Sequence, residues 1–325
     1  MIRLILFQPL QSLRAESPAL AASPKALQVQ LAKTLSGHGN TVNAVAIAPD
    51  SNTLISGSSD RSIKIWNLET GEVLNTLSGG KVNALAVSPD GQTIIHAGTD
   101  KTVKLWRLSD GKFIRTIDGF TGVVRAVAIS PDSKTFATGS LDKMVQLWDM
   151  SSGERLTTLT GHGDFVTSVA FSPDGQTLVS GGGGTDRTLK IWDLTTNQLR
   201  QTIRAHQDWI LSTAISPDGR VIASSSADKT IRLWDLSTGN RLRTLTGHKD
   251  WVRSVVFSPD SKVLFSASKD GTIKLWSVTT GKVLHTLTGH SKPILAIALS
   301  PDGKILASGS EDRTIKIWQM GKGRI

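Results

Sequence analysis

The chain has 325 residues, of which 38% are hydrophobic and 20% charged, with a formal net charge of +10. This share of apolar residues is enough to form a buried core, so the composition excludes wholesale disorder. Cysteine is absent, which excludes disulfide frameworks, thiolate metal sites and a cysteine nucleophile. Tyrosine is also absent while tryptophan occurs nine times, an imbalance that indicates a periodic use of one residue type.

The N-terminal segment, residues 1 to 26, differs from the rest of the chain. Met1–Phe7 is apolar but short, and the polar or turn-forming residues that follow interrupt it. A secretory signal needs an apolar core of about 7–15 residues before a small-residue cleavage site. Ala19-Leu20-Ala21 would supply such a site, but no adequate apolar core precedes it. We expect a flexible segment and a cytoplasmic protein, with export as the alternative. No stretch approaches the roughly 20 apolar residues of a membrane span.

From residue 27 onward the chain is built from repeats, and we expect residues 27–325 to form a single domain. Seven tryptophans recur at intervals of 40 to 44 residues: Trp66, Trp106, Trp148, Trp192, Trp234, Trp276 and Trp318. An aspartate lies six residues before each of them: Asp60, Asp100, Asp142, Asp186, Asp228, Asp270 and Asp312. A Pro-Asp pair also recurs once in every unit. The spacing indicates seven structural units.

Each unit contains short apolar runs separated by turn residues. In the sixth unit the runs are Val252–Phe257, Val263–Ser266 and Thr272–Trp276, and Pro259-Asp260 lies between the first two. Runs of four to six residues rich in Val, Ile and Leu between such turns predict β-strands. No window in the repeats carries a sustained helical period. The sequence therefore predicts an all-β array with four strands in each unit.

Two dipeptides connect these units to a known family. Gly-His occurs at Gly37-His38, Gly161-His162, Gly247-His248 and Gly289-His290, and Trp-Asp at Trp148-Asp149, Trp192-Asp193 and Trp234-Asp235. With the repeat length, these pairs make the chain similar to the WD-repeat β-propellers. The resemblance covers residues 28 to 320. It implies a seven-bladed β-propeller with four antiparallel strands per blade.

The ends of the chain predict how this propeller closes. After Trp318 too few residues remain for the fourth strand of the last unit, whereas Leu27–Leu35 is similar to the strand Val283–Leu287. We therefore expect the N-terminal strand to complete the seventh blade. Such pairing protects sheet edges that would otherwise promote aggregation.

The resemblance also implies that the repeated polar residues form a buried hydrogen-bonded tetrad of His, Ser or Thr, Asp and Trp in each blade. A buried carboxylate needs hydrogen-bond donors, and imidazole, hydroxyl and backbone N–H groups provide them. An active site needs one constellation and not seven dispersed copies, so we expect no catalytic residue, no metal site and no cofactor. The expected members, besides the aspartates and tryptophans named above, are His38, Ser56, His162, His206, Ser224, His248, Ser266, His290 and Ser308.

Three units depart from this pattern. The second has Gly80 in place of the histidine and His96 in place of the serine, and the third has Phe120 in place of the histidine. The fourth offers Ser180 only if the additional glycines of Gly181–Gly184 form a loop. We interpret His96 as a substitute tetrad partner, with a ligand or a pH sensor as the alternative.

The two remaining tryptophans, Trp209 and Trp251, occupy equivalent positions three residues after a tetrad histidine, and Phe165 holds the same slot in the fourth unit. In the resembled family this slot faces the entrance of the central channel, where partners dock. Tryptophan and arginine are enriched at binding hot spots. The resemblance therefore implies a partner-binding surface, and the alternative is a simple hydrophobic plug of the channel. Its predicted members are Phe165, Trp209, Leu211, Trp251, Arg253, Lys269 and Arg125.

The positive charge is spread around the repeats, for example at Lys64, Lys190 and Lys316 before the periodic tryptophans. A nucleic-acid site normally clusters its charge on one face, so we interpret the excess mainly as solvated surface. The sequence favours a monomeric, non-catalytic protein–protein interaction scaffold whose partner is not identified. Binding of nucleic acid or another polyanion is the alternative.

Overall fold

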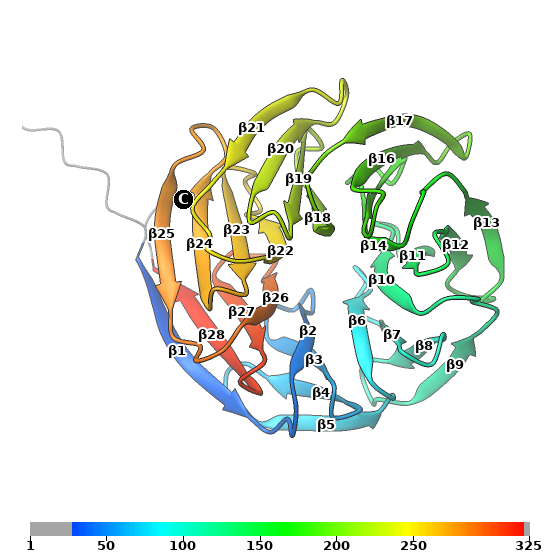
Figure 1. The fold of residues 1–325 in the computed structure, drawn as a ribbon. Helices are drawn as coiled ribbons and strands as arrows, with labels where there is room; N and C mark the ends of the chain where they lie inside the picture. The colour runs from blue at the N-terminus through cyan, green and yellow to red at the C-terminus, as the bar shows by residue number, and fades with distance from the viewer. Residues whose placement is uncertain (1–27, 322–325) are drawn as a thin grey trace, which may run out of the picture.

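The computed structural model describes residues 28–321. In that part of the chain, 28 β-strands form seven four-stranded antiparallel sheets arranged around a central axis (Figure 1). The predicted all-β, seven-bladed propeller is therefore confirmed. Within residues 28–321, no helix is long and apolar enough to cross a membrane. The segment 1 to 26, expected to be flexible, lies outside the described residues.

The first three blades follow one another from the N-terminus, each with its strands in sequence order from the channel outward. Blade 1 consists of β2 (Val42–Ile47), β3 (Thr53–Ser58), β4 (Ser62–Asn67) and β5 (Val73–Ser78). Blade 2 consists of β6 (Val82–Val87), β7 (Thr93–Gly98), β8 (Val103–Arg107) and β9 (Phe113–Ile117). Blade 3 consists of β10 (Val124–Ile129), β11 (Thr135–Ser140), β12 (Val145–Asp149) and β13 (Arg155–Leu159).

The remaining blades continue the ring. Blade 4 consists of β14 (Val166–Phe171), β15 (Thr177–Gly182), β16 (Thr188–Asp193) and β17 (Gln198–Arg204). Blade 5 consists of β18 (Ile210–Ile215), β19 (Val221–Ser226), β20 (Ile231–Asp235) and β21 (Arg241–Leu245). Blade 6 consists of β22 (Val252–Phe257), β23 (Val263–Ser268), β24 (Thr272–Ser277) and β25 (Val283–Thr288). Blade 7 combines β26 (Ile294–Leu299), β27 (Ile305–Ser310) and β28 (Thr314–Met320) with β1 (Val29–Ser36).

The position of a strand within its blade decides its burial. The second strand is packed on both faces, and in blade 6 every residue of β23 is buried. The outermost strand β25 alternates between exposed and more buried positions, with Leu287 facing the core. A continuous apolar run is typical of a strand covered on both faces, and alternation is typical of one covered on a single face.

The recurring Pro-Asp pair forms the tight turn between the first and second strands. In blade 6, Ser258 Oγ donates a hydrogen bond of 2.6 Å to Asp260 Oδ1, and Val263 N–H donates one of 2.9 Å back to Ser258 Oγ. Ser261, between them, has a φ of 63°, in the left-handed region that Gly, Asn and short polar residues tolerate best. The turn chemistry therefore fixes the angle at which each hairpin reverses.

Neighbouring blades pack through shared apolar clusters. One cluster joins Ile231, Leu233 and Leu245 of blade 5 to Leu264 and Trp276 of blade 6. Where the blades approach most closely, a glycine is needed: a Cβ at Gly57 of blade 1 would collide with the side chain of Val82 in blade 2. The core is therefore a ring of seven inter-blade layers, and each blade depends on both neighbours.

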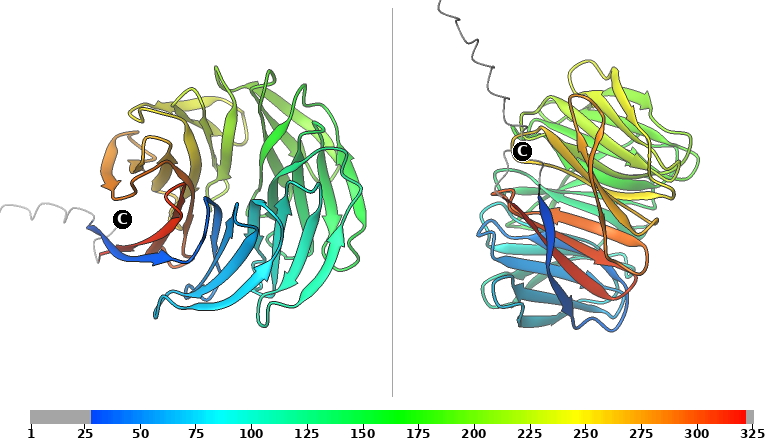
Figure 2. Two further views of the ribbon diagram at one scale, coloured as in Figure 1. Left: turned by 60° about the horizontal axis from the view of Figure 1, so that its bottom comes forward. Right: turned by 90° about the vertical axis from the view of Figure 1, so that its left-hand side faces the viewer.

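The ring is closed by hydrogen bonding between the two ends of the described chain. Strand β1 pairs antiparallel with β28, from Val29 opposite Met320 to Ser36 opposite Thr314, and Figure 2 shows the two strands side by side. Gly321 N–H donates a further hydrogen bond of 2.7 Å to Gln28 O. The predicted closure of the seventh blade by the N-terminal strand is therefore confirmed.

Candidate functional site

The repeated polar residues are buried within the blades and are hydrogen-bonded to one another. In blade 6, Trp276 Nε1–H donates to Ser266 Oγ at 2.7 Å, and His248 Nε2 lies 2.8 Å from the same oxygen. His248 Nδ1 lies 2.8 Å from Asp270 Oδ2. Because the carboxylate only accepts, Nδ1 carries the proton and Nε2 accepts from the serine hydroxyl. The indole thus donates to the serine hydroxyl, the hydroxyl donates to the imidazole, and the imidazole donates to the carboxylate.

The same three contacts recur in four other blades, with distances between 2.7 and 3.0 Å. Blade 4 includes Ser180 among them; Gly181 and Gly182 continue strand β15, and only Gly183 and Gly184 lie in the loop after it. Burial alone would raise the pKa of Asp60, but hydrogen bonds from Ser62, His38 and backbone N–H groups outweigh it and lower the pKa to about 2. The carboxylates are therefore ionised acceptors at neutral pH.

In blade 2 a different residue, His96, is the hydrogen-bond partner of the tetrad tryptophan. His96 Nδ1 accepts a hydrogen bond of 3.0 Å from Trp106 Nε1, and His96 Nε2–H donates one of 2.8 Å to Gly79 O. The ring occupies the space beside Gly79, where a Cβ would lie only 2.8 Å from Nε2. Burial is the main reason that the pKa of His96 is lowered to about 4. His96 is thus a neutral bridge between the indole and the loop backbone.

Blade 3 lacks the imidazole altogether. Phe120 is buried and packs against Trp148, with ring centroids 4.9 Å apart. Trp148 Nε1–H donates to Thr138 Oγ1 at 3.1 Å. Asp142 accepts instead from Thr121 Oγ1 and Met144 N–H, each at 3.1 Å. The tetrad of this blade is therefore split into an apolar half and a separate carboxylate half.

Three predicted site residues, Phe165, Trp209 and Trp251, lie side by side on blades 4, 5 and 6. The ring centroids of Phe165 and Trp209 are 5.4 Å apart in an edge-to-face arrangement, and those of Trp209 and Trp251 are 6.3 Å apart. Lys269 Nζ lies 4.0 Å from the centroid of the Trp251 ring. All four side chains are half-buried. We call Phe165, Trp209, Trp251 and Lys269 the aromatic patch.

Backbone hydrogen bonds fix the slots of the aromatic patch. Trp209 O accepts from Ala227 N–H and Trp251 O accepts from Lys269 N–H, both at 2.9 Å. The N–H groups of the aromatic residues are bonded as well, each to the carboxylate of the residue before it, at 2.7 to 2.9 Å. These carboxylates belong to Asp164, Asp208 and Asp250. The backbone of the aromatic residues is therefore fixed by hydrogen bonds on both its N–H and its C=O side.

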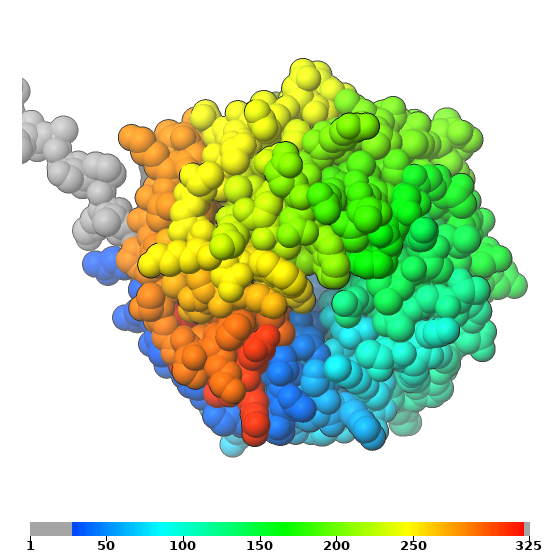
Figure 3. All heavy atoms as spheres, viewed as in Figure 1, coloured from blue at the N-terminus to red at the C-terminus, as the bar shows by residue number. Residues whose placement is uncertain are grey.

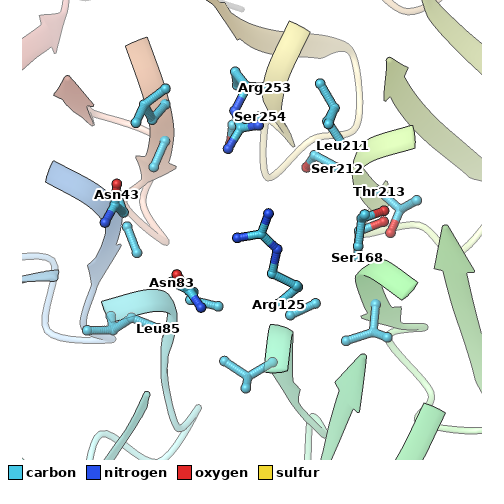
Figure 4. Close-up of a pocket in the computed structure, with 18 of the residues that line it drawn as sticks. Asn43, Asn83, Leu85, Arg125, Ser168, Leu211, Ser212, Thr213, Arg253 and Ser254 are labelled. Carbon is cyan, nitrogen blue, oxygen red and sulfur yellow. The ribbon is translucent and has the colours of Figure 1, made fainter. Parts of the chain in front are cut away.

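The other predicted site residues line the central channel. The second residue of each innermost strand faces the axis, and these seven residues are Asn43, Asn83, Arg125, Thr167, Leu211, Arg253 and Leu295. They line a cavity of about 270 Å³ whose wall also includes Phe165 and Trp209. Figure 3 shows the hollow at the centre of the ring, and Figure 4 shows Arg125 extending from β10 into the middle of it.

Among the residues that line this cavity, Arg125 and Arg253 are the only charged ones. They come from blades 3 and 6, on different sides of the channel (Figure 4). Thr167, Asn43 and Asn83 are already bonded to the backbone of the next blade, at Ile210 O, Val82 O and Val124 O. The seven channel-facing residues thus include three that join neighbouring blades and two arginines that project into the cavity.

Sequence reasoning missed two features of this region. The three aspartates directly before the aromatic residues place acidic groups at the rim, so the surface is not simply aromatic and basic. Their signal was present, since each directly precedes its aromatic residue. No such signal indicated that Arg125 and Arg253 line the same channel from different sides, because 128 positions separate them in the sequence.

The basic residues before the periodic tryptophans lie elsewhere, in the outer half of the blades. Lys64, Lys190, Lys274 and Lys316 each donate to a threonine on the outermost strand of the same blade, at 2.9 to 3.1 Å. Equivalent positions in a ring distribute these charges evenly around the molecule. They are therefore spread over several blades and are not gathered on one.

A comparison with protein-family models finds one match that covers most of the chain. The model is the WD40 family, described as WD domain, G-beta repeat, and it matches seven segments: 29–67, 71–107, 111–149, 153–193, 197–235, 239–277 and 281–319. Each segment runs from the outermost strand of one blade through the third strand of the next. No curated protein sequence matches the chain at a significant level.

Proposed function

The chain belongs to the WD40 repeat family, and from this premise we propose that it is a non-catalytic scaffold that docks a protein partner on the aromatic patch. Members of the family are commonly protein-interaction scaffolds and are usually non-catalytic. The docking surface consists of Phe165, Trp209, Trp251 and Lys269, and it continues into the channel at Leu211, Arg125 and Arg253. The partner is a protein of unidentified sequence.

The row of three contacting aromatic rings is the observation that supports this proposal. The equivalent slots of the other four blades hold Thr41, Lys81, Val123 and Pro293, so the seven-fold symmetry of the fold does not require large aromatic residues there. Half-buried tryptophans beside a cation provide large, rigid contact areas, which are typical of binding hot spots.

The proposal is tested by affinity purification with quantitative mass spectrometry, comparing the wild type with the double variant Trp209→Ala/Trp251→Ala. A matched control is Leu242→Ala/Leu284→Ala, which removes apolar side chains that are 49% and 48% exposed on the outermost strands of the same two blades. We expect at least one protein to be retained by the wild type and the control and lost by the tryptophan variant. Identical recovery by all three proteins would remove the aromatic patch from the docking surface.

The charge distribution supports the protein partner over a polyanion. The lysines bonded to threonines lie on four different blades, whereas a nucleic-acid site normally clusters its positive charge. A polyanion-binding protein loses affinity steeply as salt rises, because each neutralised phosphate releases counterions. Strong retention on a DNA column at moderate salt would support the polyanion instead. A cytoplasmic location stays a prediction, since it depends on residues 1 to 26.

A further inference from the structure

The central channel contains two positive charges that form no ion pair with the described residues. Neither Arg125 nor Arg253 forms an ion pair with an acidic side chain within residues 28–321. Arg253 Nε is buried and has no hydrogen-bond partner in this described part of the chain. A buried donor without a partner, and above all a buried charge, is costly for the folded state. The channel therefore contains groups that a ligand would satisfy.

The two arginines also act on each other. Burial, followed by the positive charge of Arg125, lowers the pKa of Arg253, and the negative charge of Glu311 opposes this. Both guanidinium groups remain cations near neutral pH, because arginine is not deprotonated in proteins. The two like charges therefore destabilise the empty channel, and an anion between them would remove their repulsion.

The size and chemistry of the cavity suit a compact anion. A volume of about 270 Å³ accommodates a single tetrahedral oxyanion with some water. Arginine offers its donors in a planar fork that fits the oxygens of phosphate or carboxylate in pairs. Ser212 and Ser254 line the same cavity, and their hydroxyl groups accept hydrogen bonds of 3.3 Å from Val255 N–H and Ile297 N–H of the next blades.

We infer that the channel binds one phosphate-sized oxyanion between Arg125 and Arg253. The anion reaches the site either as a free ion or as a phosphoryl group on the docked partner; in the second case the inference rests on the proposed function. Its oxygens accept from both guanidinium groups, and it replaces water around Arg125 while giving Arg253 the partner that it lacks. Arg125 and Arg253 thus require a negative charge on the ligand in the channel, in addition to the contacts that the aromatic patch makes at the mouth.

The first test is a calorimetric titration of the full chain with inorganic phosphate at constant ionic strength. The variants are Arg125→Leu and Arg253→Leu, because leucine occupies the equivalent ring position in blades 5 and 7, at Leu211 and Leu295. The matched control is Arg241→Leu: Arg241 is exposed on β21, and blade 4 has Leu199 opposite the equivalent tryptophan. It removes the same charge far from the channel.

We expect saturable binding of one phosphate by the wild type and the control, and affinity at least about tenfold weaker in each channel variant, since each variant loses a charged hydrogen-bond donor. Without phosphate, Arg125→Leu should raise the melting temperature, because it removes the repulsion. Phosphate should then raise the melting temperature of the wild type and not that of the double channel variant. No binding by the wild type, or equal binding by the double variant, would overturn the inference.

A second arm distinguishes the two sources of the anion. A capped tripeptide with a central phosphoserine is titrated beside phosphate. Arginine-dependent binding at least about tenfold tighter than that of phosphate supports an anion on the partner, and similar affinities support a free ion. The phosphate titration needs no partner protein, so it can fail while partner capture by the aromatic patch succeeds, and the reverse also holds.

Discussion

The tetrad positions and the channel-mouth positions recur with the same period, but the sequence treats them differently. The tetrad tryptophan and aspartate are present in all seven blades, whereas the seven mouth slots hold six different residue types. The tryptophan and aspartate have similar surroundings in every blade, and in five of the seven blades the same histidine and serine satisfy them. The mouth slots share one channel, and their differences break the symmetry of the ring. Positions that hold the same residue in every blade are therefore those that the fold requires. Positions that vary are those at which one side of the channel mouth differs from another.

The largest contrast is expected within blade 6, between Trp276→Ala and Trp251→Ala. Trp276 is 1% exposed, bonded to Ser266 and packed between blades, so its removal leaves a cavity and should destabilise the protein by about 3–5 kcal/mol. Trp251 is half-buried at the mouth, and its removal should cost about 1 kcal/mol or less. Urea unfolding of both variants measures the difference. Equal losses of stability would show that the mouth residue is part of the core.

The next effect separates blade 2 from the regular blades by its pH dependence. The pKa of His96 is lowered by burial from 6.5 to about 4, so its contribution to stability is complete above pH 6.5 and is lost as the pH falls through about 4. The unfolded state binds the proton first, and this shift corresponds to roughly 3 kcal/mol. His96→Gln keeps an acceptor for Trp106 and a donor for Gly79 O but does not titrate.

The measurement is the free energy of unfolding at pH 7 and at pH 4.5 for the wild type and His96→Gln. The wild type should lose more stability between these two values than the variant. His38 and His290, whose pKa values burial also lowers, are present in both proteins and cancel in the comparison. An equal loss of stability in both proteins would mean that the pKa of His96 is not lowered in the folded state.

A smaller effect compares the tetrad serine of blade 6 with the threonine of blade 3. Ser266→Ala leaves both Trp276 Nε1 and His248 Nε2 without their shared partner, and should cost about 2 kcal/mol. Thr138→Val removes the hydroxyl at the same position in a blade without the histidine, where only Trp148 Nε1 loses its acceptor. We expect about half the loss there. A loss at Thr138 that equals or exceeds the loss at Ser266 would contradict the split tetrad of blade 3.

Most of the architecture was predictable from the sequence because each repeat carries its own turn and core residues. The spacing of Trp66 to Trp318 gives the number of blades, and the short tail after Trp318 gives the closure by β1. Adjacent repeats are neighbours in space, so the contact between Trp209 and Trp251 was also accessible to sequence reasoning.

The remaining features depend on the whole ring. Arg125 and Arg253 share a cavity only because seven blades close around one axis, a geometry that no local pattern encodes. In blade 2, replacement of the usual residues did not reveal that the His96 ring bonds Gly79 O while filling the space beside that glycine. Both features arise where long-range packing, and not the repeat, decides what a side chain touches.

The measurement that tests the central claim most directly is the dissociation constant of a purified, captured partner for the wild type, for Trp209→Ala/Trp251→Ala and for Leu242→Ala/Leu284→Ala. If the aromatic patch is the docking surface, the tryptophan variant should bind at least about thirtyfold more weakly, as expected for the loss of a hot spot of about 2 kcal/mol or more. The leucine variant should bind as the wild type does. Equal dissociation constants for all three proteins, each folded, would contradict the account.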